Sequence, residues 1–220
     1  MLSLMSLPKT PGAVIWDMDG TLIDQTAGIV RCYEEVVSAL GHPTPDPGEI
    51  HRSMGGPMAQ TMALFVQPEE LEAACLDFRK RFPDIMYDGI IVLPGALQLV
   101  RNFYNAGVPQ AILTNKHGPT AREVSRHCGF ASYIPICVGS TDTEWSKPDP
   151  ALTGHVLKAM DASRTSGAVL IGDSPTDVAT AENAGLECYT VATGAHSTEE
   201  LIAAGGAEAV ESLNDWIELT

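Results

Sequence analysis

The chain has 220 residues, of which 45% are hydrophobic and 19% charged, an ordinary composition for a protein that buries a full core. Its 13 basic and 28 acidic residues give a formal net charge of −15, which argues against nucleic acid and acidic membrane surfaces as partners. The five scattered cysteines form no C-x-x-C pair and predict reduced thiols. With no signal peptide or membrane span expected, the sequence favours a cytoplasmic protein, either a monomer or a homodimer.

The first predicted element is a buried strand over residues 12–16. It ends in Asp17, Asp19 and Gly20, and alternation along an extended chain places both carboxylates on the same side. Two uncompensated carboxylates that close would repel each other, and a divalent cation such as Mg²⁺ relieves the repulsion. Gly20 permits a tight turn whose N–H groups can face an anion, although an Asp-Gly turn without a ligand explains the same letters.

Residues 25–93 contain helix signals and no convincing strand. A helix is predicted over 26–40, with Thr26 as its N-cap, and another over 68–82. Proline favours the first turn of a helix, so new helices are predicted to begin at Pro47, Pro57 and Pro68. This region therefore predicts a helical insertion after the first strand, joined to the rest of the chain by two hinges near 22–25 and 89–95.

Strands and helices alternate from about residue 95 onward. Strands are predicted over 109–113, 134–138, 168–171 and 187–191, and helices over 95–105, 119–127, 149–160, 175–184 and 197–204. This alternation is typical of a doubly wound parallel α/β sheet. We therefore predict an α/β core made of residues 1–23 and 94–220, and a helical cap domain made of residues 24–93.

Polar residues follow two more of the predicted strands at the point where each ends. Thr114, Asn115 and Lys116 follow the second strand, and Asp173 and Asp177 follow the fourth. Active sites of open α/β sheets lie at the carboxyl ends of the strands, so these residues are expected to converge with Asp17 and Asp19. Lys147 lies in a loop stiffened by Pro148 and Pro150, which is expected to hold an ammonium group beside the carboxylates.

The order of these motifs resembles the four-motif signature of the haloacid dehalogenase superfamily of phosphohydrolases. The matching segments are Asp-Met-Asp-Gly-Thr at 17–21, Thr114-Asn115, Lys147-Pro148 and Gly172-Asp173-Ser174 with Asp177. Each motif alone is weak, but four in order at predicted strand ends form a specific pattern. The helical insertion is similar to the phosphoglycolate phosphatase-like branch, which carries a helical cap.

The resemblance implies a role for each matching residue. Asp17 would be the nucleophile, Asp19 the general acid and base, and Thr114 the hydroxyl that binds the transferring phosphoryl group. Lys147 would neutralise that group together with Asp17. Mg²⁺ would be bound by Asp173, by Asp17 and by the backbone carbonyl of Asp19, and Asp177 would support the metal site. The implied activity is magnesium-dependent hydrolysis of a small phosphate monoester, such as phosphoglycolate or a sugar phosphate, through an aspartyl-phosphate.

Selectivity is expected to come from the cap. The predicted substrate-binding residues are Gly20, Asn115 and Lys116 in the core and Arg52, Gly55 and Gly56 in the cap. Paired glycines allow a close backbone approach to a ligand, and an arginine can bind a carboxylate or a second phosphate. A plain turn between helices explains this loop equally well. Arg31, Arg79 and Arg81 are expected on solvated faces.

Two other functions share this pattern. A phosphosugar mutase of the same fold would use the same core residues and return the phosphoryl group to the substrate. A non-catalytic phosphate-binding protein would tolerate the loss of Asp17 or Asp19, and both are present. Release of phosphate from an aryl phosphate with magnesium, and not with EDTA, separates an enzyme from a binding protein.

Overall fold

A six-stranded parallel sheet forms the larger part of the fold. The computed structural model describes residues 10–161 and 166–217. The strands of this sheet are β1 (Ala13–Trp16), β4 (Gln110–Leu113), β5 (Ile136–Val138), β6 (Ala168–Gly172), β7 (Glu187–Val191) and β8 (Glu208–Val210). They lie in the order β5-β4-β1-β6-β7-β8, and every neighbouring pair is parallel. The predicted parallel α/β fold is confirmed.

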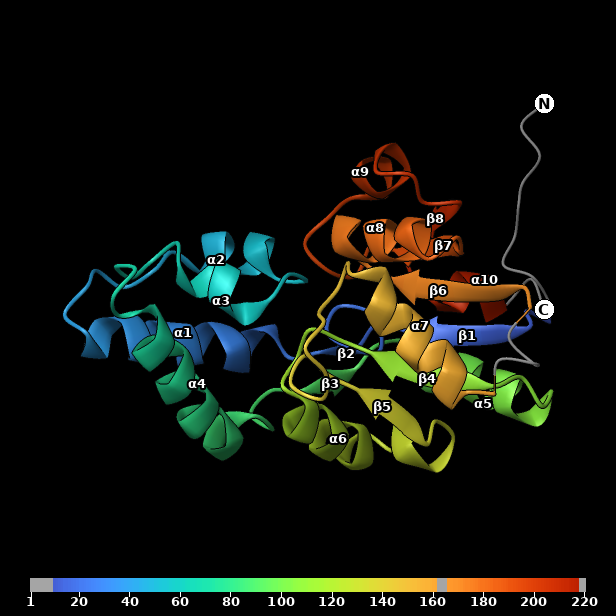
Figure 1. The fold of residues 1–220 in the computed structure, drawn as a ribbon, viewed down its shortest axis with the longest axis horizontal. Helices are drawn as coiled ribbons and strands as arrows, with labels where there is room; N and C mark the ends of the chain where they lie inside the picture. Colours follow the sequence, from blue (N-terminus) through green and yellow to red (C-terminus); the bar gives the residue numbers. More distant parts are fainter. Residues whose placement is uncertain (1–9, 162–165, 218–220) are drawn as a thin grey trace.

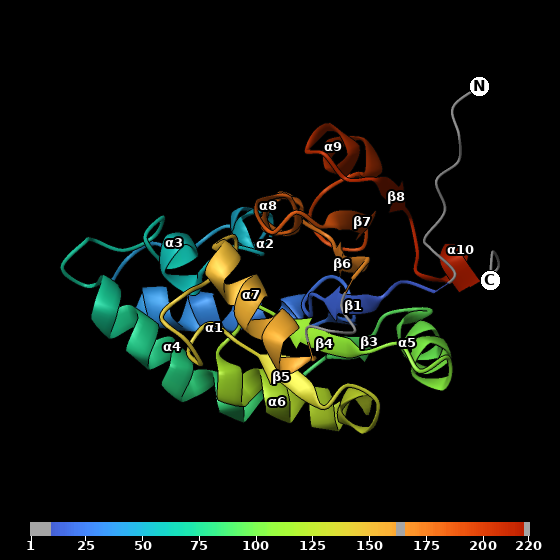
Figure 2. The same cartoon turned by 45° about the vertical axis from the view of Figure 1, so that its right-hand side comes forward.

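Helices cover both faces of this sheet (Figures 1 and 2). They are α5 (Ala96–Asn105), α6 (Gly118–His127), α7 (Pro150–Ala159), α8 (Pro175–Asn183), α9 (Thr198–Ala203) and α10 (Asn214–Ile217), with a short 3-10 turn η1 (Phe130–Ser132) after α6. Side chains of β1 alternate between the two faces. Ala13 and Ile15 pack in the cluster that includes α7 and α8, whereas Val14 and Trp16 pack in the cluster that includes α5, α6 and α10.

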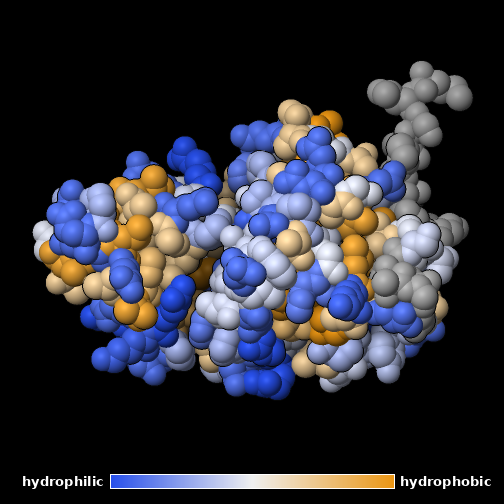
Figure 3. Space-filling model, viewed as in Figure 1, coloured by the Kyte–Doolittle hydropathy of each residue, from blue (hydrophilic) through white to orange (hydrophobic). Residues whose placement is uncertain are grey.

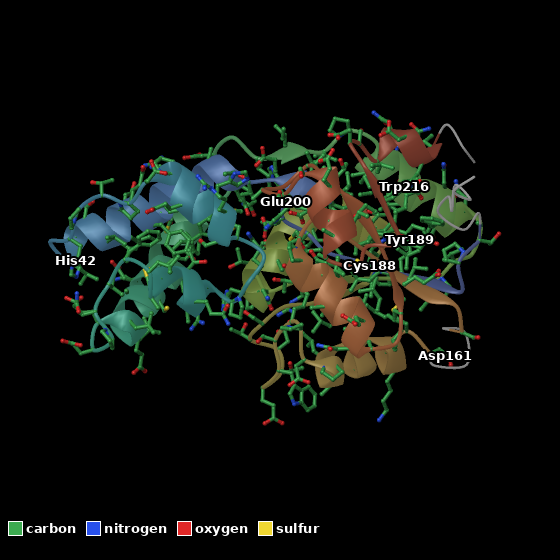
Figure 4. The ribbon with its side chains drawn as sticks, turned by 90° about the horizontal axis from the view of Figure 1, so that it is seen from above. His42, Asp161, Cys188, Tyr189, Glu200 and Trp216 are labelled. Atoms are coloured by element: carbon green, nitrogen blue, oxygen red, sulfur yellow. The ribbon has the colours of Figure 1, made fainter. Side chains whose placement is uncertain are left out.

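One strand of the sheet was not predicted. The edge strand β8 has only three residues, and all three are half-buried, so no apolar run marks it. It is held by Trp216 of α10, whose indole Nε1 donates to Glu208 at 3.1 Å. Figure 4 shows Trp216 beside Tyr189 of β7, and their ring centroids are 6.2 Å apart. The short helix α10 therefore ties the two last strands together.

Four helices between β1 and β4 lie apart from the sheet (Figure 1). They are α1 (Thr26–Ala39), α2 (Pro47–Ser53), α3 (Met58–Met62) and α4 (Leu71–Ile85). The two longest, α1 and α4, pack against each other through Tyr33 and Phe78, whose rings are 4.8 Å apart. Because α1–α4 bury apolar side chains among themselves, they form a compact part of their own; the limits of a cap domain at 24–93 stay a prediction.

A short two-stranded sheet joins the helical part to the core, and it corrects the expectation that no strand lies between 25 and 93. β2 (Ile23–Asp24) pairs antiparallel with β3 (Ile91–Val92). β3 has two exposed residues, which is too short a run to show alternation. Both predicted hinge segments thus contain a strand, and the two strands are hydrogen-bonded to each other.

Two predicted helix starts are also corrected. The N-cap of α1 is Gln25, and the backbone N–H of Thr26 donates to Asp24 Oδ1 at 2.8 Å. Asp24 thus satisfies the N–H of Thr26, the first residue of α1, which has no acceptor within the helix. Pro68 lies in a turn before α4, which begins at Leu71 and runs beyond the predicted end to Ile85. The ends of the predicted core, residues 1–9 and 218–220, lie outside the described residues.

Candidate active site

The candidate site lies where the strand order reverses. β1 has β4 on one side and β6 on the other. The chain first forms β4 and β5 on one side of β1, and then forms β6, β7 and β8 on the other side. Crevices at the carboxyl ends of such strands are the usual ligand sites of open α/β sheets. Asp17 directly follows β1, Thr114 follows β4 and Asp173 follows β6. The sheet therefore brings these three side chains to one edge.

Three carboxylates and one ammonium group form a buried cluster at this edge. Carboxylate oxygens of Asp17, Asp173 and Asp177 all lie within 4.8 Å of one another. Lys147 Nζ donates to Oδ1 of Asp17 and to Oδ1 of Asp177, at 2.6 Å in each case. The four residues are at most 7% exposed. With every group ionised, the cluster carries two negative charges in excess, which a divalent cation would balance.

Burial shapes the protonation of the cluster. It raises the pKa of Asp17 to about 7, although the charge of Lys147 opposes this. Burial also raises the pKa of Asp173 well above its usual range, and the negative charges of Asp17 and Asp177 add to this. Burial alone would lower the pKa of Lys147, but the two carboxylates outweigh it and raise the pKa. Lys147 therefore stays positively charged. A single lysine does not balance the negative charges of the three carboxylates.

The hydrogen bonds show which oxygens can bind a cation. Asp177 uses Oδ1 for Lys147 and accepts at Oδ2 from the backbone N–H and the hydroxyl of Ser174. Asp173 accepts at Oδ1 from the Thr21 hydroxyl at 2.9 Å. Within the described residues, Oδ2 of Asp17 and Oδ2 of Asp173 receive no hydrogen bond. These two oxygens fit a divalent metal, whereas Asp177 positions Lys147 and caps α8.

Two glycines leave room around Asp173. A Cβ on Gly20 would lie 2.3 Å from Asp173 Oδ2, and a Cβ on Gly194 would lie 1.8 Å from the same oxygen. Gly20 also has a φ of 84°, which glycine adopts without strain. Positions 20 and 194 therefore both require glycine, because a larger residue at either one would clash with Oδ2 of Asp173.

Backbone N–H groups near Asp17 can bind an anion. In the turn after β1, the N–H groups of Thr21, Leu22 and Ile23 all donate to the carbonyl of Met18. Within the described part of the chain, the N–H groups of Met18 and Asp19 have no such acceptor. Successive free N–H groups form a concave anion-binding site. The turn can thus hold an anion beside Asp17.

The residues after β4 serve different purposes. Thr114 is 2% exposed, and its Oγ1 accepts from the Lys116 N–H at 3.1 Å. Asn115 holds the Lys147 loop, because its Oδ1 accepts from the Lys147 N–H at 2.9 Å. Its Nδ2 donates to the carbonyl of Gly55 at 3.0 Å, which links the core to the helical part. Lys116 Nζ lies 3.0 and 3.1 Å from the two carboxylate oxygens of Asp19.

A cavity of about 290 Å³ lies between the helical part and the edge of the sheet. Figure 3 shows a hollow between these two parts. Asp17, Asp19 and Thr114 line it on the core side, together with Asn115 and Lys116. The cavity therefore begins at the predicted reacting groups and extends toward α1, α3 and α4, where a leaving group would lie.

The predicted cap residues separate into two sets. Gly55 and Gly56 line the cavity, and Gly55 approaches Ser174 so closely that a Cβ would lie 3.0 Å from its hydroxyl oxygen. Arg52 is exposed and, among the described residues, is not part of the cavity lining. Arg79 is exposed, as expected, and it also lines the cavity. Its position on α4 beside Phe78 brings it over the site.

Sequence reasoning did not single out Gly194 or Arg79. Gly194 follows β7 just as Asp17 follows β1, so the end of a predicted strand was the available signal. Arg79 shares a helix face with Cys75 and Phe82, four residues before it and three after it, and those apolar residues could have indicated that this face turns toward the core. Neither signal distinguishes these residues from others of their type without the fold.

Comparisons with known proteins identify the family to which the chain belongs. The family model for haloacid dehalogenase-like hydrolases matches residues 14–191. "Probable phosphatase IndB" of Dickeya dadantii is 27% identical over 210 residues, covering 93% of this chain and 91% of the relative. The phosphoglycolate phosphatase of Rhodospirillum rubrum is 29% identical over 222 residues, covering 94% and 91%. A haloacid dehalogenase-like family hydrolase of Streptococcus pneumoniae has a similar structure, with a TM-score of 0.85, 19% identity and coverage of 97% and 99%.

The chain belongs to the haloacid dehalogenase-like hydrolases. Its relatives include phosphatases that match nearly its whole length, and the chain is a phosphatase of this family. The buried carboxylates of Asp17 and Asp173 fit the divalent metal that such phosphatases use. Among the described residues, no helix combines the length and apolar character that crossing a membrane requires.

Proposed function

We propose that this phosphatase hydrolyses a small phosphate monoester through an aspartyl-phosphate on Asp17, with Mg²⁺ as its metal. The observation that carries the proposal is the buried cluster of Asp17, Asp173 and Asp177 around Lys147, with two negative charges in excess. Because carboxylate oxygens suit magnesium and Asp17 of this cluster lines the cavity, a phosphate monoester and the metal can meet at Asp17.

The reaction has two displacements at phosphorus. A carboxylate oxygen of Asp17 attacks phosphorus, the bond to the ester oxygen breaks, and Asp19 gives its proton to the departing alkoxide. Water then attacks the aspartyl-phosphate, Asp19 takes a proton from that water, and the bond from phosphorus to Asp17 breaks. The products are an alcohol and inorganic phosphate, and both aspartates return to their starting forms.

Like-charge repulsion is the main obstacle, because an anionic nucleophile approaches an anionic phosphoryl group. Lys147 lies 2.6 Å from Asp17 and can neutralise oxygens of the phosphoryl group. The Thr114 hydroxyl and the N–H groups of Met18 and Asp19 are donors for the same oxygens. Mg²⁺, held by Asp17 and Asp173, would supply further positive charge at the phosphoryl oxygens.

Asp19 and Lys116 must change their relation during the cycle. Lys116 binds both oxygens of Asp19, which is the arrangement of an ionised carboxylate. An acid that donates to the leaving group must hold a proton on one of those oxygens, so Asp19 takes up a proton from solvent and loses one Lys116 contact before the first displacement. We therefore assign Lys116 the positioning of Asp19, with release of one contact when the phosphoryl group attracts the ammonium.

The test compares wild type with Asp17→Asn on an aryl phosphate and on phosphoglycolate. We expect release of phosphate that requires Mg²⁺ and stops with EDTA, and at least a thousandfold slower turnover for Asp17→Asn with an unchanged circular dichroism spectrum (about 10³ or more for a lost nucleophile). When a reaction with a substrate labelled in its phosphoryl group is quenched with acid, the trapped phosphoprotein should carry the label on Asp17. Turnover of the variant at the wild-type rate would refute the assignment, and isomerisation of a sugar phosphate without free phosphate would indicate a mutase.

A further inference from the structure

The wall of the cavity beyond Asp19 is largely apolar. Its apolar lining residues are Ile29, Tyr33, Met54, Met58, Phe78, Phe82 and Trp145. Three of them form a row of rings: the centroids of Tyr33 and Phe78 are 4.8 Å apart, and those of Phe78 and Phe82 are 5.3 Å apart. Lys116 Nζ lies 5.0 Å from the Phe82 ring and holds Asp19. The aromatic row therefore begins beside the acid that would protonate a leaving group.

Apart from Arg79, Glu144 and Ser146, the polar side chains in the same lining are already engaged. Thr61 donates to the carbonyl of Ser53, and Ser140 donates to the carbonyl of Lys116. Thr120 is bonded to the ring of His117, and Asn115 binds the two loops described above. A sugar buried here would leave hydroxyl groups without partners, which costs about 1–3 kcal/mol for each one. The wall thus disfavours polyhydroxylated leaving groups.

Arg79 supplies positive charge at this end of the cavity. Among the described residues it forms no salt bridge, whereas Arg31 and Arg81 of the same helical part are paired with carboxylates. His117 lines the cavity from the core side. Burial, followed by the positive charge of Arg79, lowers the pKa of His117, with smaller effects from Asp142 and Arg122. Glu144 also lines the cavity, but it does not contribute to that shift. An anionic group at this end of the cavity would therefore be attracted by the guanidinium of Arg79.

We infer that the enzyme prefers phosphate monoesters of an apolar, aromatic alcohol that carries a carboxylate at its far end. This substrate class rests on the proposed function. The phosphoryl group lies at Asp17, the ring lies along Tyr33, Phe78 and Phe82, and the carboxylate meets Arg79. Glycolate is too short to reach this wall while its phosphoryl group contacts Asp17, because its carboxylate is separated from the ester oxygen by a single carbon.

The first test uses the wild-type enzyme with Mg²⁺ and four monoesters of primary alcohols: para-carboxybenzyl, benzyl and ethyl phosphate, and a hexose phosphate. Their leaving groups have similar reactivity, so kcat/KM reports on contacts with the cavity. We expect benzyl phosphate to exceed ethyl phosphate by at least about tenfold, from burial of the ring. The para-carboxybenzyl ester should exceed benzyl phosphate by about tenfold again, a charge-assisted hydrogen bond being worth at least that much.

The second test assigns the charge preference to one residue. Arg79→Gln should lose the tenfold preference for the carboxylate, measured as the ratio of kcat/KM for para-carboxybenzyl phosphate to that for benzyl phosphate in the same variant. The matched control is Lys80→Gln, the next residue on α4, which is exposed and, within the described residues, is not part of the lining. It removes the same charge and should keep the preference. Arg52→Gln should also keep it, because Arg52 lies outside the cavity lining that the described residues form.

The outcomes separate this inference from the proposed function. Faster turnover of ethyl phosphate or the hexose phosphate than of benzyl phosphate would overturn the apolar substrate class and leave the phosphatase intact. Loss of the carboxylate preference in Arg52→Gln or Lys80→Gln, and not in Arg79→Gln, would overturn the role of Arg79. Failure of all four esters with Mg²⁺ would instead refute the proposed function itself.

Discussion

Removing the divalent metal is expected to destabilise the protein far more at pH 8 than at pH 5.5. The reason is the cluster of Asp17, Asp173 and Asp177, which has Lys147 as its neutralising group and is almost fully buried. Burial raises the pKa of Asp17 to about 7 and the pKa of Asp173 well above its usual range. Without metal, the folded state therefore binds protons that the unfolded chain releases.

The sign and size follow from linkage. In the unfolded chain these carboxyl groups titrate near a pKa of about 3.9. Because the pKa of Asp17 is higher in the folded state, protonated Asp17 contributes its full stabilisation of the fold below the unfolded pKa of about 3.9. This contribution to the free energy of unfolding is lost as the pH rises through about 7. From pH 5.5 to 7 the loss is about 2 kcal/mol for Asp17 alone, at about 1.4 kcal/mol for each unit. In a protein of this size that lowers Tm by about 4–8 °C.

The assay is thermal unfolding in EDTA and in Mg²⁺ at pH 5.5 and pH 8. In EDTA, we expect Tm to fall between these two pH values. Mg²⁺ should restore it mainly at pH 8, where the carboxylates are ionised, by about 2.7 kcal/mol at one hundred times its Kd. Asp173→Asn should reduce both effects, and the exposed Glu211→Gln is the control that should keep them. Equal effects of Mg²⁺ at both pH values would refute the reasoning.

Three further predictions concern single residues. Lys147→Met should lower kcat by about 100–1000-fold, as loss of a charge that stabilises the transition state does, and a rate within tenfold of wild type would contradict this. Gly55→Ala should raise KM several-fold in steady-state kinetics, because a Cβ would lie 3.0 Å from the Ser174 hydroxyl and shift the loop. The control is Gly41→Ala: Gly41 has a similar positive φ, but a Cβ there would have no atom within 4 Å, so its KM should equal that of the wild type. Gly194→Ala should weaken Mg²⁺ binding at least tenfold in calorimetry, because its Cβ would displace Asp173 Oδ2, and unaltered affinity would argue against that oxygen as a ligand.

The sheet and its order of motifs could be predicted because buried parallel strands leave strong signals. β1, β4 and β6 are entirely buried, so each appears as an apolar run that ends where the polar site begins. The ends of these runs identified Asp17 and Asp173, which the fold brings together. The edge of the sheet at which such residues lie depends on chain order and on strand direction, and both can be predicted from the sequence.

The helical part could be predicted only in outline. Its helices were expected, but β3 has two exposed residues and no pattern that marks a strand. The orientation of α4 determines that Arg79 lines the cavity. That orientation depends on packing of α4 against α1, where Tyr33 and Phe78 meet. Long-range packing of this kind is not encoded in the spacing of residues along one segment.

The pairing of β2 with β3 limits how the enzyme can open. The chain crosses between the sheet and the helices twice, and hydrogen bonds fasten these crossings into one ribbon. A double-stranded ribbon bends far more easily than its strands slide or swivel apart. Release of an alcohol product should thus proceed by a clamshell movement about a single axis, which breaks the hydrogen bond from Asn115 to Gly55 that links the core to the helical part.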